Sequence, residues 1–268
     1  MINAIRSEFL KYFTTRLWWG MAIAAFLIGA GASGFFGFTF TYLLNQPGAG
    51  GETLDLEPVQ TANTVYTAAL IMGAYVLTLT IGVLQVGSEY RHKTITSTLL
   101  TTPQRMRSLL AKVIAVAGIA VVNGVILLLG SVVAGAITIK AFGGDPFPAA
   151  EIIRSLAMLL LVLVVWGLIG LAAGILIPNQ VAALLISIGL AYMVEPMLTF
   201  GLQFWSWGAQ HLVPYFPTQA TSAVVNNINL FGPAAQRLDW WVAALVLLGY
   251  AVVLAGLGLW RASREDVS

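Results

Sequence analysis

Six long apolar windows constrain this chain more than any other feature of its sequence. They lie at residues 17–44, 64–88, 113–139, 156–177, 181–205 and 240–260. In lipid only a helix satisfies its own backbone hydrogen bonds, so apolar runs of 18 or more residues predict membrane-spanning helices. The last window has 21 residues and would be about 31 Å long as a helix, enough to cross a hydrocarbon core of about 30 Å. The ~10-residue alternating segments of a membrane β-barrel are absent. We therefore predict an all-α integral membrane protein with six transmembrane helices.

The charged residues support this class and predict an orientation. Only 9% of the residues are charged, against roughly a quarter in soluble domains. If both termini are cytoplasmic, 10 of the 13 Lys and Arg residues lie on the inner face, as the positive-inside rule requires. These are Arg6, Lys11, Arg16, Arg91, Lys93, Arg105, Arg107, Lys112, Arg261 and Arg264. The net charge of +2 then reflects topology and does not indicate nucleic-acid binding.

Residues 1–16 precede the first window and predict a separate inner-face helix. Ile2, Ile5, Phe9 and Phe13 recur at helical spacing, with polar residues between them. Such an amphipathic helix would lie in the inner headgroup layer, either as a basic anchor or as a surface that also touches a partner. The apolar run of 28 residues that follows is longer than the core of a signal peptide, so we expect residues 17–268 to form one transmembrane domain.

The segment 89–112 packs six charges between two apolar windows. Thr102-Pro103 is typical of a helix start, with threonine as the N-cap and proline at the first position. Upstream, Ile95, Leu99 and Leu100 place apolar side chains on one face of a short helix. A basic loop that binds anionic lipid would also fit this charge. The ordered helix–turn–helix layout favours an element that docks a partner.

Glu195 and Pro196 interrupt the fifth window. Glu195 lies 14 residues after Val181, about 21 Å along a helix. A charge near the middle of a bilayer costs ~2.5–3.5 kcal/mol on insertion scales, so it is expected to have a specific environment. Three interpretations stay open: the carboxylate lines a substrate route, it accepts hydrogen bonds from amides of the outer segment, or the helix ends there and the residue meets water. Pro196 removes one backbone hydrogen bond and predicts a bend or an end.

Residues 201–239 are too apolar for a free loop and contain three prolines, Pro214, Pro217 and Pro233. Aromatic side chains such as Trp205 and Trp207 suit the outer membrane interface. We predict short broken helices that re-enter or lie on the outer leaflet before the last span.

No catalytic constellation is found in the sequence. A phosphate-binding loop of the form Gly-x-x-x-x-Gly-Lys-Ser/Thr is missing, so we expect no ATP hydrolysis by that route. The only histidines, His92 and His211, fall on opposite sides of the predicted membrane, which argues against a histidine-rich metal site. We therefore expect neither an enzyme nor a bound cofactor or metal in this chain.

Taken together, these features resemble the permease family of type-2 ABC transporters. The most specific part is the run Glu89–Arg105, which is similar to the family's loop with an acidic residue, Tyr/Arg, Leu-Leu and Thr/Ser-Pro-x-Arg; Glu195-Pro196 also resembles bacterial members. The resemblance implies the permease subunit of a bacterial ATP-driven exporter in the cell membrane. Its partners would be two separate ATP-binding-cassette ATPase subunits, which bind ATP and Mg, a second permease copy, and membrane lipids.

The resemblance also implies roles for individual residues. A translocation or gating role falls to Glu195 and Pro196. ATPase coupling falls to residues of the 89–112 loop, namely Glu89, Tyr90, Arg91, His92, Lys93, Thr94, Leu99 and Arg105. Two other classes stay open: a membrane scaffold or sensor without transport, and an ATP-independent secondary carrier. A carrier is expected to have inverted repeats and several embedded ionisable residues.

Overall fold

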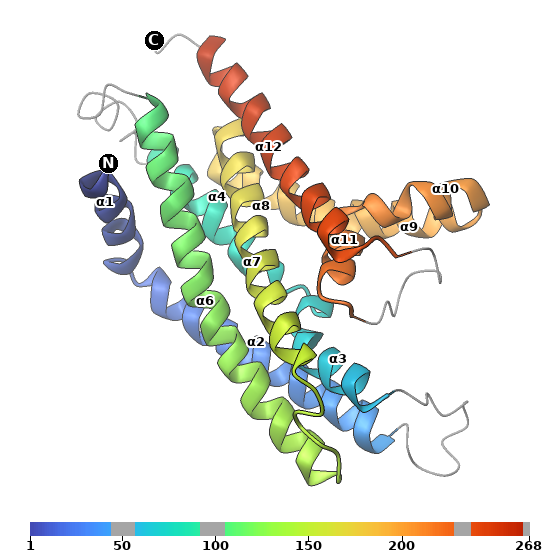
Figure 1. Ribbon diagram of the computed structural model, residues 1–268. Coiled ribbons are helices and arrows are strands. Elements are labelled where there is room, and N and C mark those ends of the chain that lie inside the picture. Colours follow the sequence, from blue (N-terminus) through green and yellow to red (C-terminus); the bar gives the residue numbers. More distant parts are fainter. Residues whose placement is uncertain (44–56, 92–104, 228–236, 265–268) are drawn as a thin grey trace.

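The computed structural model describes residues 1–43, 57–91, 105–227 and 237–264, and in these ranges it is a helical bundle without strands (Figure 1). Six segments of the described part are long and apolar enough to cross a membrane. They run over residues 17–42, 58–91, 108–141, 151–176, 180–203 and 240–258. The predicted all-α class and the six spans are confirmed. The main difference is at the second span, which begins earlier, at Pro58, and is interrupted.

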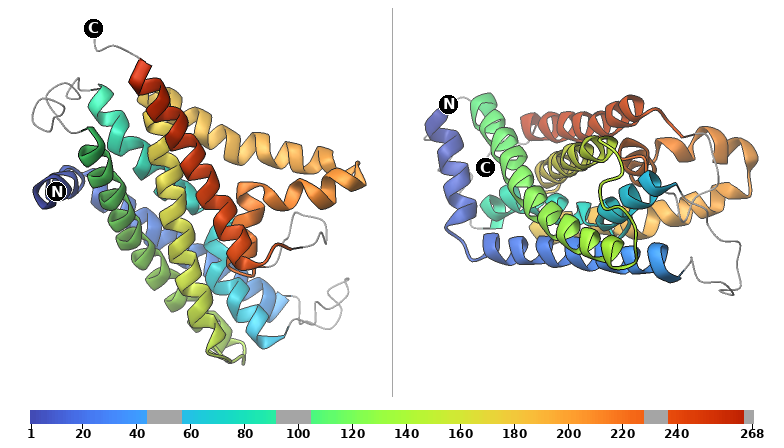
Figure 2. Two further views of the ribbon diagram at one scale, coloured as in Figure 1. Left: turned by 45° about the horizontal axis from the view of Figure 1, so that its top comes forward. Right: turned by 60° about the horizontal axis from the view of Figure 1, so that its bottom comes forward.

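The chain begins with the predicted short helix, α1 (Ile2–Phe13), followed by α2 (Leu17–Phe38) and a π-helical turn, η1 (Thr39–Leu43). The long helix α6 (Arg105–Ala141) packs along α2 and contacts α1. The first helix and the end of α12 (Trp240–Arg264) lie at the same end of the bundle (Figures 1 and 2). A chain that crosses the membrane six times must have both of its ends on the same side. We call this end of the bundle the α1 end.

Close contact between the second and fourth spans forms the centre of the bundle. The second span consists of α3 (Pro58–Ile71) and α4 (Tyr75–Arg91), and the fourth is α7 (Glu151–Leu176). A Cβ on Gly82 would lie 2.0 Å from the carbonyl oxygen of Gly167, and one on Gly170 would lie 2.0 Å from that of Leu79. Small residues allow such backbone contact in membranes. Gly170 and Gly174, four residues apart, both lie on the face of α7 that meets α4.

A turn at Gly73 breaks the second span inside the membrane. Gly73 has φ +80°, and the N–H groups of Ala74 and Gly73 donate to the carbonyls of Ala69 and Leu70 at 2.8 and 3.0 Å. This pattern is a Schellman motif, in which glycine in the left-handed region ends a helix and satisfies two of its last carbonyls. The chain then resumes as α4. The hydropathy of this window predicts no break, because the residues around Gly73 are apolar.

The fifth span leans away from the bundle. It consists of α8 (Gln180–Gly189), the π-helical turn η2 (Leu190–Val194) and α9 (Glu195–Gln203). The Asn179 side chain caps α8 by accepting from the N–H groups of Val181 and Ala182. Only 17% of the most apolar window of this span is buried, and α9 projects sideways together with α10 (Ser206–His211) (Figures 1 and 2).

After α10, a 3₁₀ turn, η3 (Val213–Tyr215), leads to α11 (Pro217–Val224), which packs on α12 and contacts α7. The predicted short broken helices are therefore confirmed for residues 201–227, the part of that segment that precedes 228–236. Pro217 stands in the first turn of α11, a position that tolerates its missing N–H group.

Candidate functional site

Four charged side chains from three helices meet near the α1 end of the bundle. Nζ of Lys11 lies 2.8 Å from Oε1 of Glu8 and 2.5 Å from Oε1 of Glu89. Nζ of Lys112 lies 3.0 Å from Oε1 of Glu8 and also contacts Oε1 of Glu89. Glu8, Glu89 and Lys112 are each only 4% exposed. We call these four residues the charge cluster. It joins α1, the end of α4 and the start of α6.

The charge cluster is balanced and well hydrogen-bonded. Two carboxylates face two ammonium groups, and Nε2 of Gln85 adds hydrogen bonds to Oε2 and the main-chain oxygen of Glu8, at 3.0 and 3.1 Å. Buried charges are tolerated only when they are paired in this way. The three buried members, Glu8, Glu89 and Lys112, therefore depend on this pairing for their burial.

The pKa values of the two groups on α1 follow from this pairing. Burial by itself would raise the pKa of Glu8, but the charge of Lys112 and the hydrogen bonds from Lys11 and Lys112 outweigh it and lower that pKa below its ordinary value. Burial by itself would lower the pKa of Lys11, but hydrogen bonds to Glu8 and Glu89 outweigh it and raise that pKa. Both groups therefore stay charged over a wider pH range than in water.

The residues predicted to couple to an ATPase fall around the charge cluster. Glu89 belongs to it, and its carboxylate faces α1 and α6. Tyr90 is half-buried and packs against Val86, while Arg91 is exposed at the end of α4. His92, Lys93, Thr94 and Leu99 lie outside the described residues, as does the predicted N-cap at Thr102-Pro103. Arg105 is the first residue of α6, which runs without a break into the third span.

Glu195 caps a neighbouring helix within the membrane. Its Oε1 accepts hydrogen bonds from the main-chain N–H of Thr218, at 2.7 Å, and from the hydroxyl of the same residue, and the main-chain N–H of Gln219 adds a further one. These groups belong to the first turn of α11, where a carboxylate satisfies free N–H groups and the helix dipole favours negative charge. Of the three interpretations of Glu195, the hydrogen bond to outer-segment amides is present. A role in a pathway stays a prediction.

Pro196 does not end the helix. The π-helical turn η2 directly precedes it, the N–H of Glu195 donates to the carbonyl of Leu190, and α9 continues to Gln203. The wider turn admits the proline ring and its missing N–H group, which a regular helix interior would not. The helix therefore passes through Pro196 with a local change of winding.

Tyr192, within the same turn, contacts the break in the second span. Its hydroxyl donates to the main-chain oxygen of Met72 at 3.0 Å, and a Cβ on Gly73 would lie 1.4 Å from that hydroxyl. Tyr192 also stacks on Tyr75, which stacks on Trp166. Nε1 of Trp166 donates to the hydroxyl of Thr221 at 2.8 Å. These contacts connect the second, fourth and fifth spans with α11.

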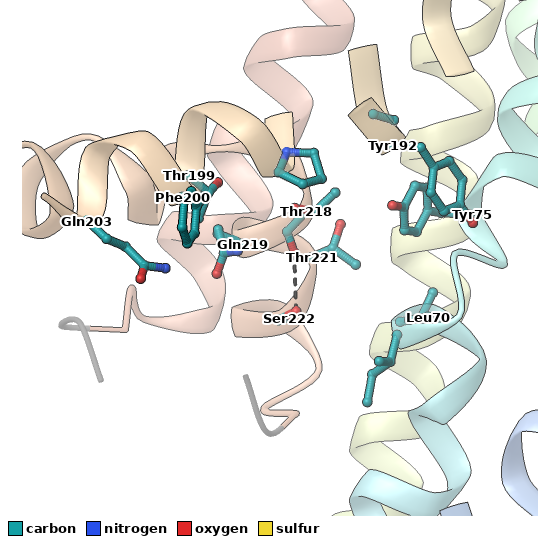
Figure 3. Close-up of a pocket in the computed structure, with 13 residues that line it drawn as sticks. Leu70, Tyr75, Tyr192, Thr199, Phe200, Gln203, Thr218, Gln219, Thr221 and Ser222 are labelled. Atoms are coloured by element: carbon teal, nitrogen blue, oxygen red, sulfur yellow. Dashed lines mark hydrogen bonds between the residues drawn. The ribbon is translucent and has the colours of Figure 1, made fainter. Parts of the chain in front are cut away.

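A cavity of about 460 Å³ opens between these elements. Figure 3 shows Leu70 and Tyr75 on one wall, Thr199, Phe200 and Gln203 of α9 on the opposite wall, and residues of α11 between them. A second cavity of about 420 Å³, lined mainly by apolar residues, lies beside it and includes Glu195. Ala191 lines both cavities. The protein therefore contains two adjoining cavities, and the first has more hydroxyl and amide side chains in its lining than the second.

The pattern of single segments does not predict several residues of these sites. Glu8 and Lys112 lie 104 positions apart, and no local spacing brings them together. The partner of Tyr192 is a main-chain carbonyl, which has no sequence signature. The predicted window at 64–88 gave no signal of the break at Gly73, because its 25 residues fit a single crossing.

A comparison with protein-family models finds a match over nearly the whole chain. The matching model is described as ABC-2 family transporter protein, and it covers residues 2–267. No curated protein matches the chain.

Proposed function

Because this chain belongs to the ABC-2 family of transporter proteins and is a membrane permease component of an ABC transporter, we propose that it forms the export pathway and is driven by separate ATPase subunits. Two ATP-binding-cassette subunits and a second permease copy complete the transporter. ATP and Mg bind to those partner subunits, and this chain supplies the pathway and the coupling surface. The transporter lies in a bacterial plasma membrane with both termini cytoplasmic.

The observation that carries this proposal is the charge cluster. It fixes the end of α4 to the start of α6 and to α1, so the two helix ends that flank residues 92–104 are tied to each other and to the surface helix. A force applied to the loop between them would move all three helices together, because separating any one would strand a buried charge. This is the mechanical property that a coupling element needs.

Coupling has a thermodynamic requirement as well. ATP can shift the permease between two conformations only if the ATPase subunits bind ATP with different affinity in each of them. Closure of the ATPase pair would then move the tied helices at the α1 end. The outer segment α10–α11, joined to the fifth span by Glu195, would respond at the other side as a gate.

Co-purification tests the proposal. A candidate ATPase subunit is sought among the products of neighbouring genes, as a protein with a phosphate-binding loop and no membrane span, and it is expected to co-purify with the wild-type chain. Replacing Arg91, Thr94 and Leu99 together by alanine should abolish this association. As a control, Lys140→Ala at the end of α6 away from the α1 end should leave it intact. Association that survives the triple replacement would refute the docking role of the loop.

The same preparation distinguishes the alternative classes. A scaffold or sensor would bind the ATPase without stimulating ATP hydrolysis or moving a substrate. A secondary carrier would transport in proteoliposomes that contain no ATPase at all. An exporter permease requires the ATPase and ATP together.

A further inference from the structure

Two spans lose regular helical structure at about the same depth in the membrane. From Pro58 to the break at Gly73, α3 descends about 20 Å, and from Gln180 to Tyr192 the fifth span rises about 18 Å. In a core of about 30 Å both breaks lie close to the middle. Irregular backbone at this depth is tolerated only where it is buried in protein or lines a cavity. The hydroxyl of Tyr192, which donates to the carbonyl of Met72, shows how one such group is satisfied.

The 460 Å³ cavity lies at these two breaks (Figure 3). Its side chains are unusual for the middle of a membrane, because many of them carry hydroxyl or amide groups. Thr199 is 4% exposed, and its hydroxyl has no partner among the described residues. A buried hydroxyl without a partner is costly unless something satisfies it. Gln203, at the far end of α9, is exposed and adds an amide group to the lining.

The lining carries no formal charge. Glu195 directly precedes Pro196 of this lining, but its carboxylate lines the adjoining apolar cavity. Thr218 and Gln219 donate hydrogen bonds to that carboxylate. A charged group entering the 460 Å³ cavity would therefore find no side chain of opposite charge in its lining. Aromatic rings contribute the apolar part of the surface: Tyr75 and Tyr192 stack on each other, and Phe200 lies on the opposite wall.

We propose that this cavity binds an uncharged ligand with an aromatic or apolar body that carries hydroxyl or amide groups, and that this ligand class is the cargo of the exporter. The assignment as cargo rests on the proposed function; binding in the cavity does not. Hydroxyl and amide groups of the ligand pair with Gln203 and Thr199 of α9. The rings of Tyr75, Tyr192 and Phe200 pack against the apolar body of the ligand.

Three photoreactive probes of similar size test the ligand class. The uncharged probe is N-(2-hydroxyethyl)-4-benzoylbenzamide, the anion is 4-benzoylbenzoate, and the cation is (4-benzoylbenzyl)trimethylammonium. Each is irradiated with the full-length chain in phosphatidylcholine nanodiscs, and the labelled residues are mapped by mass spectrometry. The uncharged probe should label α9 or α11, and the two ions should label them about tenfold less, as expected when a charge lacks a counter-ion.

Two variants and one control make the test specific. Ser222→Trp fills the cavity and should abolish labelling of α9 and α11. Gln203→Leu, at an exposed position, does not threaten folding and should reduce labelling about fivefold through the loss of one hydrogen-bonding group. Val252→Trp places the same bulk on α12 at a residue that is 69% exposed, and labelling should be unchanged.

Equal labelling by all three probes, or labelling that Gln203→Leu does not change, would overturn the proposal. Its failure is distinct from failure of the proposed function, because co-purification with the ATPase does not involve the cavity. If the ATPase associates and the cavity is not labelled, only this inference is wrong. If the cavity is labelled as expected and the ATPase does not associate, the ligand site stands and the exporter assignment is wrong.

Discussion

The hydroxyl of Tyr192 lies 3.0 Å from the main-chain oxygen of Met72, so a side chain of the fifth span caps the end of α3 in the second span. A helix end leaves carbonyl oxygens without intrahelical partners. Water satisfies them in a soluble protein, whereas the middle of a membrane offers none. One phenol group therefore stabilises the break at Gly73 and fixes the distance between two spans.

The first prediction concerns Gly73. Gly73→Ala should destabilise the protein by about 1–2 kcal/mol from the left-handed backbone alone, with a further cost because the new Cβ would overlap the hydroxyl of Tyr192. The measurement is thermal unfolding in detergent. In a Tyr192→Ala background the steric part disappears and the backbone part remains, so the penalty should become smaller.

Gly249→Ala is the matched control for that substitution, because no atom beyond its own turn of helix lies within 4 Å of the Cβ it would add. It should be neutral or slightly stabilising. Equal penalties for Gly73→Ala with and without Tyr192 would contradict the proposed contact.

The second prediction separates two roles of Glu195. Glu195→Leu removes the acceptor for the N–H of Thr218 and should cost about 1–3 kcal/mol, the penalty of an unsatisfied buried donor. Glu195→Gln keeps an oxygen that can accept and should cost less. Transport and ATPase stimulation are measured alongside stability. If Glu195→Gln leaves both activities unaltered, the carboxylate has no pathway role and serves as a helix cap.

The third prediction concerns the charge cluster. Lys112→Met leaves two buried carboxylates facing one lysine and should destabilise the protein by about 3–5 kcal/mol, as when a buried pair loses one partner. Lys11→Met removes the cluster's more exposed cation, with 37% of the side chain accessible, and should cost much less. Adding Glu8→Gln to Lys112→Met restores charge balance and should recover part of the loss. Stabilities that are equal for the two lysine variants would contradict the described burial.

The fourth prediction is the pH dependence of α1 packing. The lowered pKa of Glu8 contributes stability that is fully present above its unfolded value of about 4.3 and is lost as pH falls through its lower folded pKa. The raised pKa of Lys11 contributes stability that is present below about 10.4 and is lost as pH rises through its higher folded pKa. Packing of α1 should therefore be constant between about pH 5 and 10.

Labelling measures this dependence directly. The chain contains no cysteine, so Phe9→Cys provides one thiol, at a half-buried position where α1 faces Gly118 of α6. The thiol is labelled with a nitroxide at one fixed pH, because thiol reactivity itself changes with pH. The mobility of the attached label, read by electron paramagnetic resonance at each pH, should increase only at the two extremes. Release of α1 near neutral pH would show that other contacts, and not the cluster, set its position.

Hydropathy was sufficient to predict the bundle, and tertiary contacts account for what it missed. The spans follow from apolar length, and α1 follows from the spacing of Ile2, Ile5, Phe9 and Phe13. The break at Gly73 was missed because a Schellman turn needs only one glycine, and glycine is common in membrane helices. Glu195 stood out as a lone charge, but its partner Thr218 depends on how α11 folds back, which no pattern in residues 201–239 specifies.

The fifth span makes its side-chain hydrogen bonds to neighbouring helices at its middle and few contacts along α9. Tyr192 and Glu195 hold its middle to α3 and α11, whereas α9 beyond them is largely exposed and leans outward. The span is therefore held by Tyr192 and Glu195 near the centre of the membrane, and α9 extends from that point with few contacts. A small rotation at Glu195 becomes a larger displacement at Gln203, about 12 Å farther along the helix. The outer end of this span is where a modest change at Gly73 or α11 would have its greatest mechanical effect.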